Sequence, residues 1–193
     1  MSKKLFEKWH TFTFTAACLL IAFSGSLWAT TLKIALIDTP DSITKAYMLK
    51  HILEAKTDHN VDLVNSSVES MWQGITTGEL DASFSVILPE QQAQFEQYKN
   101  LIEDLGPNWI GKTITVHTIV RKGLTEKDIT VVRFLNNYCL CGERLNSAKN
   151  LLKNKMISRT DAMLWMEENK PWLHNMMGFA RPYADREARN VTY

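Results

Sequence analysis

The order of apolar segments between Leu32 and Val86 constrains the fold of this chain more than any other feature. Apolar residues recur at close to a 3.6-residue spacing from Ile43 to Leu53 and from Val68 to Ile75, as in amphipathic helices. Around these helices lie three short segments with the pattern of buried or half-buried strands, at 32–37, 61–64 and 80–86. Strands that alternate with helices in this way predict a parallel sheet with right-handed crossovers.

Turn-forming and helix-capping residues separate these segments. The first strand is followed by Asp38-Thr39-Pro40-Asp41-Ser42, in which we expect Asp41 or Ser42 to cap the helix that follows. Ser66 or Ser67 is the expected cap of the second helix, which ends near Gly78. Both helices therefore have sequence signals at their first residues as well as an apolar face.

The second half of the chain adds one strand and several helices. We expect a helix from Pro89 to about Tyr98, a loop from Asp104 to Lys112 and a fourth strand from Thr113 to Val120. The remaining helices are expected at about 125–141, 143–154, 158–169 and 171–179. The predicted fold class is a single α/β domain, with a mostly parallel sheet of four or five strands and helices on both faces.

Residues 1–29 have the order of a secretory signal peptide. Basic residues (Lys3, Lys4 and Lys8) precede an apolar run from Thr11 to Phe23, and small residues follow as far as Ala29. The run is too short to span a bilayer. We therefore expect cleavage near Ala29 and a periplasmic protein, with an uncleaved anchor as the alternative. The expected mature chain is a domain at 30–180 and a flexible tail at 181–193.

Charge and motifs argue against several classes of function. The formal net charge is only +1, so nothing electrostatic favours nucleic acid or a membrane surface as a partner. The sequence has no nucleophile elbow, no phosphate loop and no paired carboxylates. The histidines are scattered. We therefore expect neither catalysis nor a metal or other cofactor. Trp72, on the apolar face of the second helix, is expected in the core.

Cys139 and Cys141 are the two cysteines outside the expected signal peptide. An exported protein meets oxidising conditions, in which paired cysteines tend to be bridged. Residues two apart close a tight ring, however, so good disulfide geometry is hard to reach. We interpret them as half-buried thiols on a helix, in preference to a redox or metal role, and leave their redox state open.

Several motifs occur in an order typical of one known family. The succession "DTPDS", "TTGELDASFSVILP" and "EDLGPNW" resembles the first lobe of the glycine betaine/proline-type substrate-binding proteins of ABC transporters, which are type II periplasmic binding proteins. The later "TITVHTIVRKGLTEKDITVVRFLNNYCL" is similar to the part of that family that returns from the second lobe, and "ISRTDAMLWMEENKPWLHNMM" to its C-terminal helix. The resemblance covers about residues 32–177.

Two departures from the family pattern affect function. Members have two lobes that close on the ligand, whereas here the first-lobe segment ending near Trp109 runs almost directly into the returning segment at Thr113. The second lobe is therefore expected to be missing. The family also holds a quaternary ammonium between tryptophans, and the lobe-one tryptophan position matches Ile87, which offers no cation–π contact.

The resemblance and the expected sheet together indicate a ligand-binding edge. Ligands of parallel α/β sheets bind at the carboxyl ends of strands, and a helix N-terminus there attracts anions. The candidate ligand-binding residues are Thr39, Pro40, Asp41, Ser42, Ile87, Leu88, Pro89 and Trp109. For the residues of the first turn, helix capping is the alternative role. For Trp109, the alternative is a lid over the sheet edge.

The implied function is a periplasmic solute-binding-like protein related to glycine betaine or quaternary amine uptake, with ligand binding weakened or altered. Its expected partners are a small quaternary amine or amino-acid-like solute, an ABC permease, or a second copy bound through the open face. The alternative is an interaction or sensory module derived from such a lobe that no longer binds a ligand.

Overall fold

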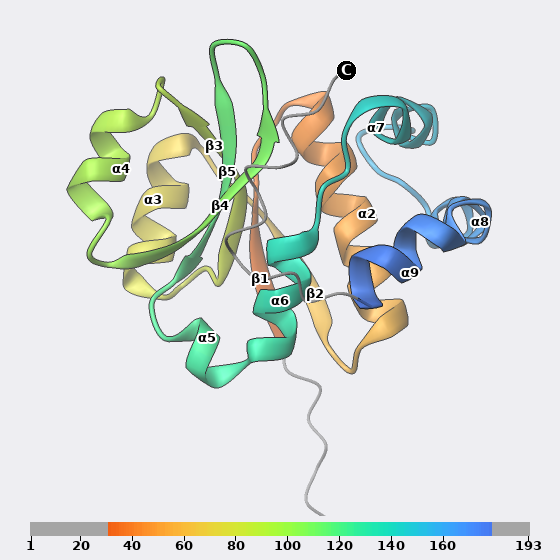
Figure 1. Ribbon diagram of the computed structural model, residues 1–193, viewed down its shortest axis with the longest axis horizontal. Helices are drawn as coiled ribbons and strands as arrows, with labels where there is room; N and C mark the ends of the chain where they lie inside the picture. Colours follow the sequence, from red (N-terminus) through yellow and green to blue (C-terminus); the bar gives the residue numbers. More distant parts are fainter. Residues whose placement is uncertain (1–30, 179–193) are drawn as a thin grey trace, which may run out of the picture.

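A five-stranded mixed sheet forms the centre of the protein (Figure 1), whose computed structural model describes residues 31–178. The strands are β1 (Thr31–Leu36), β2 (Asn60–Asn65), β3 (Ala82–Leu88), β4 (Ile102–Ile110) and β5 (Thr115–Arg121), in the order β2-β1-β3-β5-β4. β1 pairs in parallel with β2 and β3, whereas β5 is antiparallel to β3 and β4. Four strands thus point the same way, which confirms the predicted mostly parallel α/β lobe. The signal peptide predicted at residues 1–29 and the tail predicted at 181–193 lie outside the described residues.

Helices cover both faces of this sheet. They are α2 (Pro40–Lys56), α3 (Val68–Thr77), α4 (Gln92–Tyr98), α5 (Leu124–Lys127), α6 (Ile129–Asn137), α7 (Gly142–Lys149), α8 (Arg159–Glu168) and α9 (Lys170–Gly178). The larger core cluster joins α2 and α6–α9 to one face, and the smaller one joins α3 and α4 to the other. Trp72 of α3 is 1% exposed in the smaller cluster, as predicted. No helix within residues 31–178 is long and apolar enough to cross a membrane.

Local sequence explains where the first two helices begin. Ser67 caps α3, accepting a hydrogen bond from Ser70 N–H while the Ser70 side chain bonds back to Ser67 N–H. Gly78 ends the helix at φ +81°, a left-handed conformation that suits glycine. α2 is capped by Thr39, so the expectation that Asp41 or Ser42 would be the cap is wrong. Thr39 takes this role because Pro40, whose missing N–H costs nothing there, occupies the first helical position.

Most of the expected loop from Asp104 to Lys112 is instead part of strand β4, which continues to Ile110. The prediction was wrong because Gly106 (φ +83°) and Pro107 are residue types typical of turns, yet here they lie within the strand, at register shifts against β5. These bulges absorb the irregular residues without ending the pairing. Residues 111–114 then turn the chain directly into β5, with Gly111 N–H donating to Ile114 O at 2.8 Å. The β4–β5 hairpin projects from the lobe at the top of Figure 1.

The helices after β5 are shorter than their patterns predicted. The expected helix at 125–141 is divided into α5 and α6 at Asp128, whose side chain accepts from Val131 N–H at 3.0 Å and caps α6. Cys139 and Cys141 follow α6 in a loop, so their expected place on a helix is wrong. The helix expected from Pro89 begins at Gln92, and the one expected at 143–154 ends at Lys149.

Candidate functional site

The N-terminus of α2 lies at the carboxyl end of β1, where the sequence placed half of the candidate site. Thr39 Oγ1 accepts from Ser42 N–H at 3.2 Å, and Thr39 O accepts from Ile43 N–H at 2.9 Å. Thr39, Pro40 and Asp41 are exposed. This turn therefore presents the positive end of a 17-residue helix to solvent.

Ser42 faces inward and ties this helix to the sheet. Its side chain is buried, and its hydroxyl lies 2.9 Å from the hydroxyl of Ser85 on β3. A hydroxyl pair of this kind fixes the first turn of α2 against β3. Ser42 thus holds the first turn of α2 against β3, and its partner Ser85 is a residue that the sequence analysis did not single out.

Ile87 and Leu88 end β3, and Pro89 follows them at the same edge. Ile87 and Leu88 are half-buried, Pro89 is exposed, and the Leu88–Pro89 peptide bond is cis. Leu88 packs with the α3–α4 cluster, so successive side chains place Ile87 on the opposite face of the sheet. Ile87 is therefore the member of this group that can contribute apolar surface beside α2.

Trp109 lies in edge strand β4 and not in a loop, so its expected setting is wrong. Its ring folds onto the hairpin turn: a Cβ atom added to Gly111 would come within 2.4 Å of Trp109 Cη2. The side chain remains 38% exposed. Only a glycine at 111 leaves room for the ring in this position, which holds the indole beside the end of β4.

Two of these positions form one row across the sheet with a residue of the strand between them. Val116 of β5 pairs with Ile87 on one side and with Trp109 on the other. Directly paired residues of neighbouring strands share a face, so the three side chains make a continuous apolar row. The structure thus brings Ile87 and Trp109 together through Val116, a residue the sequence analysis did not single out.

Charges near the α2 terminus are paired. Asp41 accepts a hydrogen bond from Lys149 Nζ of α7 at 2.7 Å. Burial lowers the pKa of Lys45, one turn further along α2, while Cys139, Asp41 and Cys141 oppose that shift in decreasing order. An anion at this helix end would meet the Asp41 carboxylate, partly offset by Lys149.

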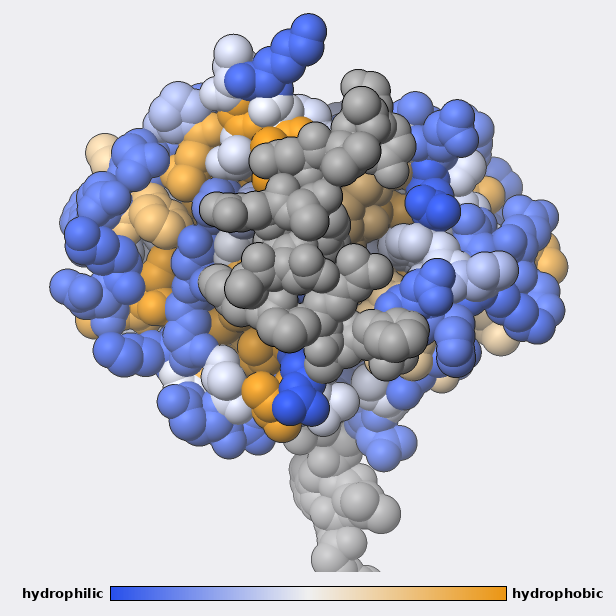
Figure 2. Space-filling model, in the orientation of Figure 1, coloured by the Kyte–Doolittle hydropathy of each residue, from blue (hydrophilic) through white to orange (hydrophobic). Residues whose placement is uncertain are grey.

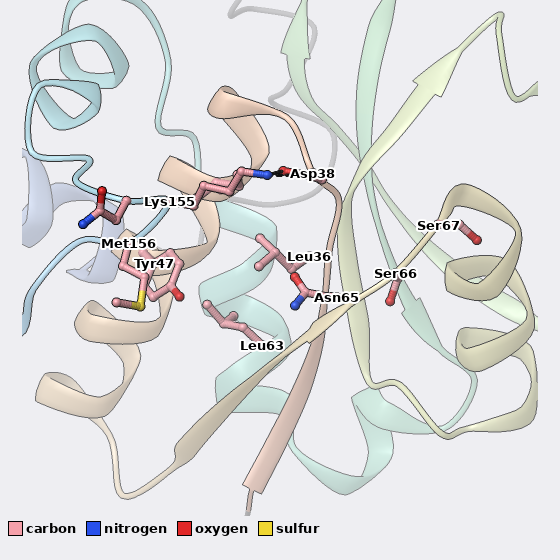
Figure 3. Close-up of a pocket in the computed structure, with 11 residues that line it drawn as sticks. Leu36, Asp38, Tyr47, Leu63, Asn65, Ser66, Ser67, Lys155 and Met156 are labelled. Atoms are coloured by element: carbon pink, nitrogen blue, oxygen red, sulfur yellow. Dashed lines mark hydrogen bonds and ion pairs between the residues drawn. The ribbon is translucent and has the colours of Figure 1, made fainter.

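An open cleft of about 520 Å³ lies beside this turn, at the carboxyl ends of β1 and β2. It forms because the helices that follow these two strands, α2 and α3, leave toward opposite faces of the sheet. The lining residues are Leu36, Asp38, Ile43, Tyr47, Leu63, Asn65, Ser66, Ser67, Asn154, Lys155 and Met156. Figure 3 shows the ion pair from Lys155 Nζ to the Asp38 carboxylate, at 2.7 and 2.8 Å.

The segment that carries Lys155 to this cleft is a tight hairpin between α7 and α8. Lys153 and Met156 exchange two backbone hydrogen bonds, of 2.8 and 2.9 Å. The two residues between them, Asn154 and Lys155, have φ of +50° and +59°. Consecutive left-handed residues of this kind define a two-residue hairpin turn. An Asn followed by Lys is a weak signal for it, so the sequence did not reveal this wall of the cleft.

Two amide side chains, half-buried Asn108 and buried Gln91, support the strands behind the site. Asn108 Nδ2 donates to Phe84 O and to Thr118 Oγ1, each at 3.1 Å, and so bridges β4, β3 and β5. Gln91 Nε2 donates to Ser85 O at 3.3 Å. Between residues 31 and 178, no group of three or more His, Cys, Asp or Glu side chains is arranged to hold a metal ion.

Part of the chain matches a known protein family. Residues 30–115 match the family model described as the substrate binding domain of ABC-type glycine betaine transport system. The expected resemblance to that family is thereby confirmed for this part of the chain. No curated protein is similar enough in sequence to be counted as a relative.

Three solved structures share the fold at low sequence identity. Lactococcal OpuAC, in its closed conformation with glycine betaine, is 11% identical; the match covers 77% of this chain and 99% of that chain, with a TM-score of 0.67. An ABC-transporter choline binding protein in complex with choline is 12% identical over 77% and 91%, with a TM-score of 0.68. The glycine betaine/L-proline-binding protein ProX of Borrelia burgdorferi is 13% identical over 79% and 100%, with a TM-score of 0.64.

Proposed function

We propose that this chain is an exported solute-binding lobe related to ABC-type uptake of small quaternary amines or amino-acid-like solutes, and that it is not an enzyme. The family match over residues 30–115 supports this proposal, and so do three neighbours of the same fold whose structures are described by glycine betaine, choline or proline binding. In this proposal the signal peptide is cleaved near Ala29 and the protein acts in the periplasm, beside an ABC permease.

The observation that carries the proposal is the placement of a helix N-terminus next to an apolar row. The positive end of α2 attracts a solute carboxylate, to which the backbone N–H of Asp41 can donate, since Pro40 has no N–H and the Thr39 N–H donates to Ile37 O at 2.8 Å. The row of Ile87, Val116 and Trp109 then contacts the methyl groups of the ammonium end. The Ser42–Ser85 hydroxyl contact holds the two parts in register. A zwitterion with its charges a few bonds apart suits this arrangement.

Affinity in this site is expected to be lower than in a two-lobed binding protein. Ile87 has no aromatic face for a cation, and Trp109 is partly exposed, where a cation–π contact contributes about 0.5–1 kcal/mol. Within residues 31–178, the short turn at 111–114 joins β4 directly to β5 and adds no second wall over this face of the lobe. A permease or a second copy of the chain, bound over the open face, would supply that wall.

Calorimetric titration with glycine betaine, choline, proline and carnitine tests the proposal, with light scattering on the same samples. We expect saturable binding of at least one of these solutes, weakened by Trp109→Leu. The matched control is Lys99→Leu. Lys99 follows α4 and forms a surface ion pair with Glu96, so this substitution changes a charge away from the candidate site. Absence of saturable binding across the panel by correctly folded protein would contradict the proposal.

An interaction or sensory module is the second candidate function. It is favoured by two large apolar side chains at the end of β4, Trp109 and Ile110, which are 38% and 43% exposed. Figure 2 shows hydrophobic surface below the hydrophilic tip of the hairpin. In this case the titrations are silent, and serine at both positions changes the association state seen by light scattering. A neighbouring gene for a membrane kinase would favour sensing, whereas permease and ATPase genes favour uptake.

A further inference from the structure

The loop between α6 and α7 brings two thiols into contact. Cys139 Sγ and Cys141 Sγ lie 2.6 Å apart, and both side chains are half-buried. The backbone is extended at Tyr138, with φ −69° and ψ 108°, and at Cys141, with φ −142° and ψ 169°. Residues two apart in extended chain point to the same side, so this loop geometry itself aims one thiol at the other.

Neighbouring side chains hold the loop in this conformation. Tyr138 is 3% exposed, its ring stacks on Phe134 with centroids 6.1 Å apart, and its hydroxyl donates to Lys45 O of α2 at 2.8 Å. Leu140, between the cysteines, is 1% exposed in the core. A buried anchor before the cysteines and another between them restrict the approach of the thiols to one arrangement.

The surroundings of the pair favour a thiolate. Lys45 is buried beside both cysteines; burial lowers its pKa, while Cys139, Asp41 and Cys141 raise it. Cys141 is the N-cap residue of α7, and no side chain caps that helix end. A neighbouring lysine and a helix N-terminus are the two features that most often stabilise a cysteine thiolate. Tyr138 stays neutral, since burial first, and then Cys139 and Cys141, raise its pKa well above the ordinary value.

We propose that Cys139, Cys141 and Lys45 form a redox-active site, in which the two thiols close reversibly to a disulfide by exchange with a dithiol/disulfide oxidant. The thiolate of one cysteine attacks a sulfur of the oxidant disulfide and expels one oxidant thiol. The second cysteine then attacks the mixed disulfide, forms the Cys139–Cys141 bond and expels the other thiol. The cysteines lose two electrons and two protons, and the oxidant becomes two thiols.

Ring size explains why this bond is reversible. A disulfide closed over the single residue Leu140 makes a small ring, and strained disulfides have higher reduction potentials than structural ones. Asp41, which opposes the pKa shift of Lys45, also accepts the hydrogen bond from Lys149 of α7. The redox site therefore lies against the first two turns of α2, yet it needs no bound solute, and its test is independent of the proposed function.

Mass spectrometry of one peptide tests the pairing. The full chain is equilibrated in glutathione buffers of graded redox ratio, quenched with acid, alkylated and digested with trypsin, which cuts after Arg133 and Arg144. Both cysteines then lie in peptide 134–144, apart from Cys18. We expect this peptide to change from two alkyl groups to none as the buffer becomes oxidising, and back again on reduction. In Cys139→Ser, Cys141 should instead retain a glutathione adduct, because no resolving thiol remains.

Two alkyl groups at every glutathione ratio, or glutathione adducts in place of the internal bond in wild type, would overturn the proposal. So would an internal bond that reductant cannot open. The role of Lys45 has its own readout, the alkylation rate of the reduced peptide against pH. Lys45→Met should move the midpoint of this profile to higher pH, whereas Lys56→Met, at the other end of α2, should leave it unchanged. Equal profiles for wild type and Lys45→Met would show that Lys45 has no role in the redox site.

Discussion

Ile87→Trp should restore a cation contact that the candidate site lacks. Ile87 pairs with Val116, which pairs in turn with Trp109, so a tryptophan at 87 would face the existing one across one intervening strand. Strands lie about 4.8 Å apart, which places the Cα atoms of residues 87 and 109 about 10 Å from each other. A quaternary ammonium above Val116 could therefore lie within about 6 Å of both ring centroids, the range of a cation–π contact.

The expected gain in binding free energy depends on how exposed the new cation–π contact is to solvent. A cation–π contact is worth about 0.5–1 kcal/mol at an exposed site and about 2 kcal/mol when desolvated. Trp109 is 38% exposed and Ile87 is half-buried, so the new contact should contribute about 1 kcal/mol. This corresponds to roughly a fivefold lower Kd for glycine betaine, measured by calorimetric titration.

Two matched comparisons separate cation–π attraction from added apolar area. Ile87→Leu changes the shape without adding an aromatic face, and should leave Kd nearly unchanged. Tert-butylacetate, in which carbon replaces the quaternary nitrogen of glycine betaine, carries no positive charge and should not gain from Ile87→Trp. An equal gain for both solutes, or none for glycine betaine in a variant that keeps its unfolding free energy, would refute this account of residue 87.

Three further perturbations follow from contacts around the site. Ser42→Ala and Ser85→Ala should each lower the free energy of unfolding by about 1 kcal/mol in urea titrations, and the double variant should fall short of their sum because both break one hydrogen bond. Asp41→Asn removes a carboxylate from the positive end of α2. Solutes with a carboxylate should then gain about 0.3–1 kcal/mol of binding free energy, which lowers their Kd about 2–5-fold. An unchanged Kd would mean that the solute carboxylate binds elsewhere. Burial by itself raises the pKa of Glu54, but hydrogen bonds from Lys50 and from a β2 backbone N–H bring it below 4.5. Its stabilisation is thus present above about pH 4.5 and is lost as pH falls through the lower folded-state pKa, so the unfolding free energies of wild type and Glu54→Gln should converge in acid.

The first three strands and two helices could be predicted because their signals are local and consistent. Apolar residues repeat at the strand or helix period, and capping residues such as Ser67 and Gly78 mark the helix ends. The order of these elements then leaves few parallel arrangements. β4 could not be predicted in the same way. Gly106 and Pro107 read as a loop, and only pairing with β5 makes the segment a strand, since the bulges accommodate both residues.

The place of the candidate residues at one edge of the sheet could be predicted because strand ends and helix starts meet there in a parallel sheet. The internal contacts of the candidate site could not, since they join residues far apart in sequence. Ser42 and Ser85 are 43 residues apart, and Lys155 meets Asp38 across 117 residues. Thr39 caps α2 in place of the predicted Asp41 or Ser42, because Pro40, which follows Thr39, is the first residue of the helix. The loop conformation of Cys139 likewise depends on Tyr138 being held by α2, a contact with no sequence signal.

If the proposed solute site is correct, the short turn at 111–114 limits how much of a solute residues 31–178 can enclose. Ligand pockets usually bury about 70–90% of a ligand, whereas one open face contacts about half of it. If binding free energy falls in the same proportion, a solute held by two walls at a Kd of about 1 μM, or −8.2 kcal/mol, would be held by one wall at about −4.6 to −5.9 kcal/mol, which is a Kd of roughly 0.05–0.4 mM. A second copy on the open face would return the missing contacts only when two chains meet. Solute affinity should then rise with protein concentration, and solute should shift the monomer–dimer balance by the same factor, because the two equilibria are linked. Light scattering with and without saturating glycine betaine measures this coupling; affinity that stays constant across protein concentrations would mean that the single lobe binds alone.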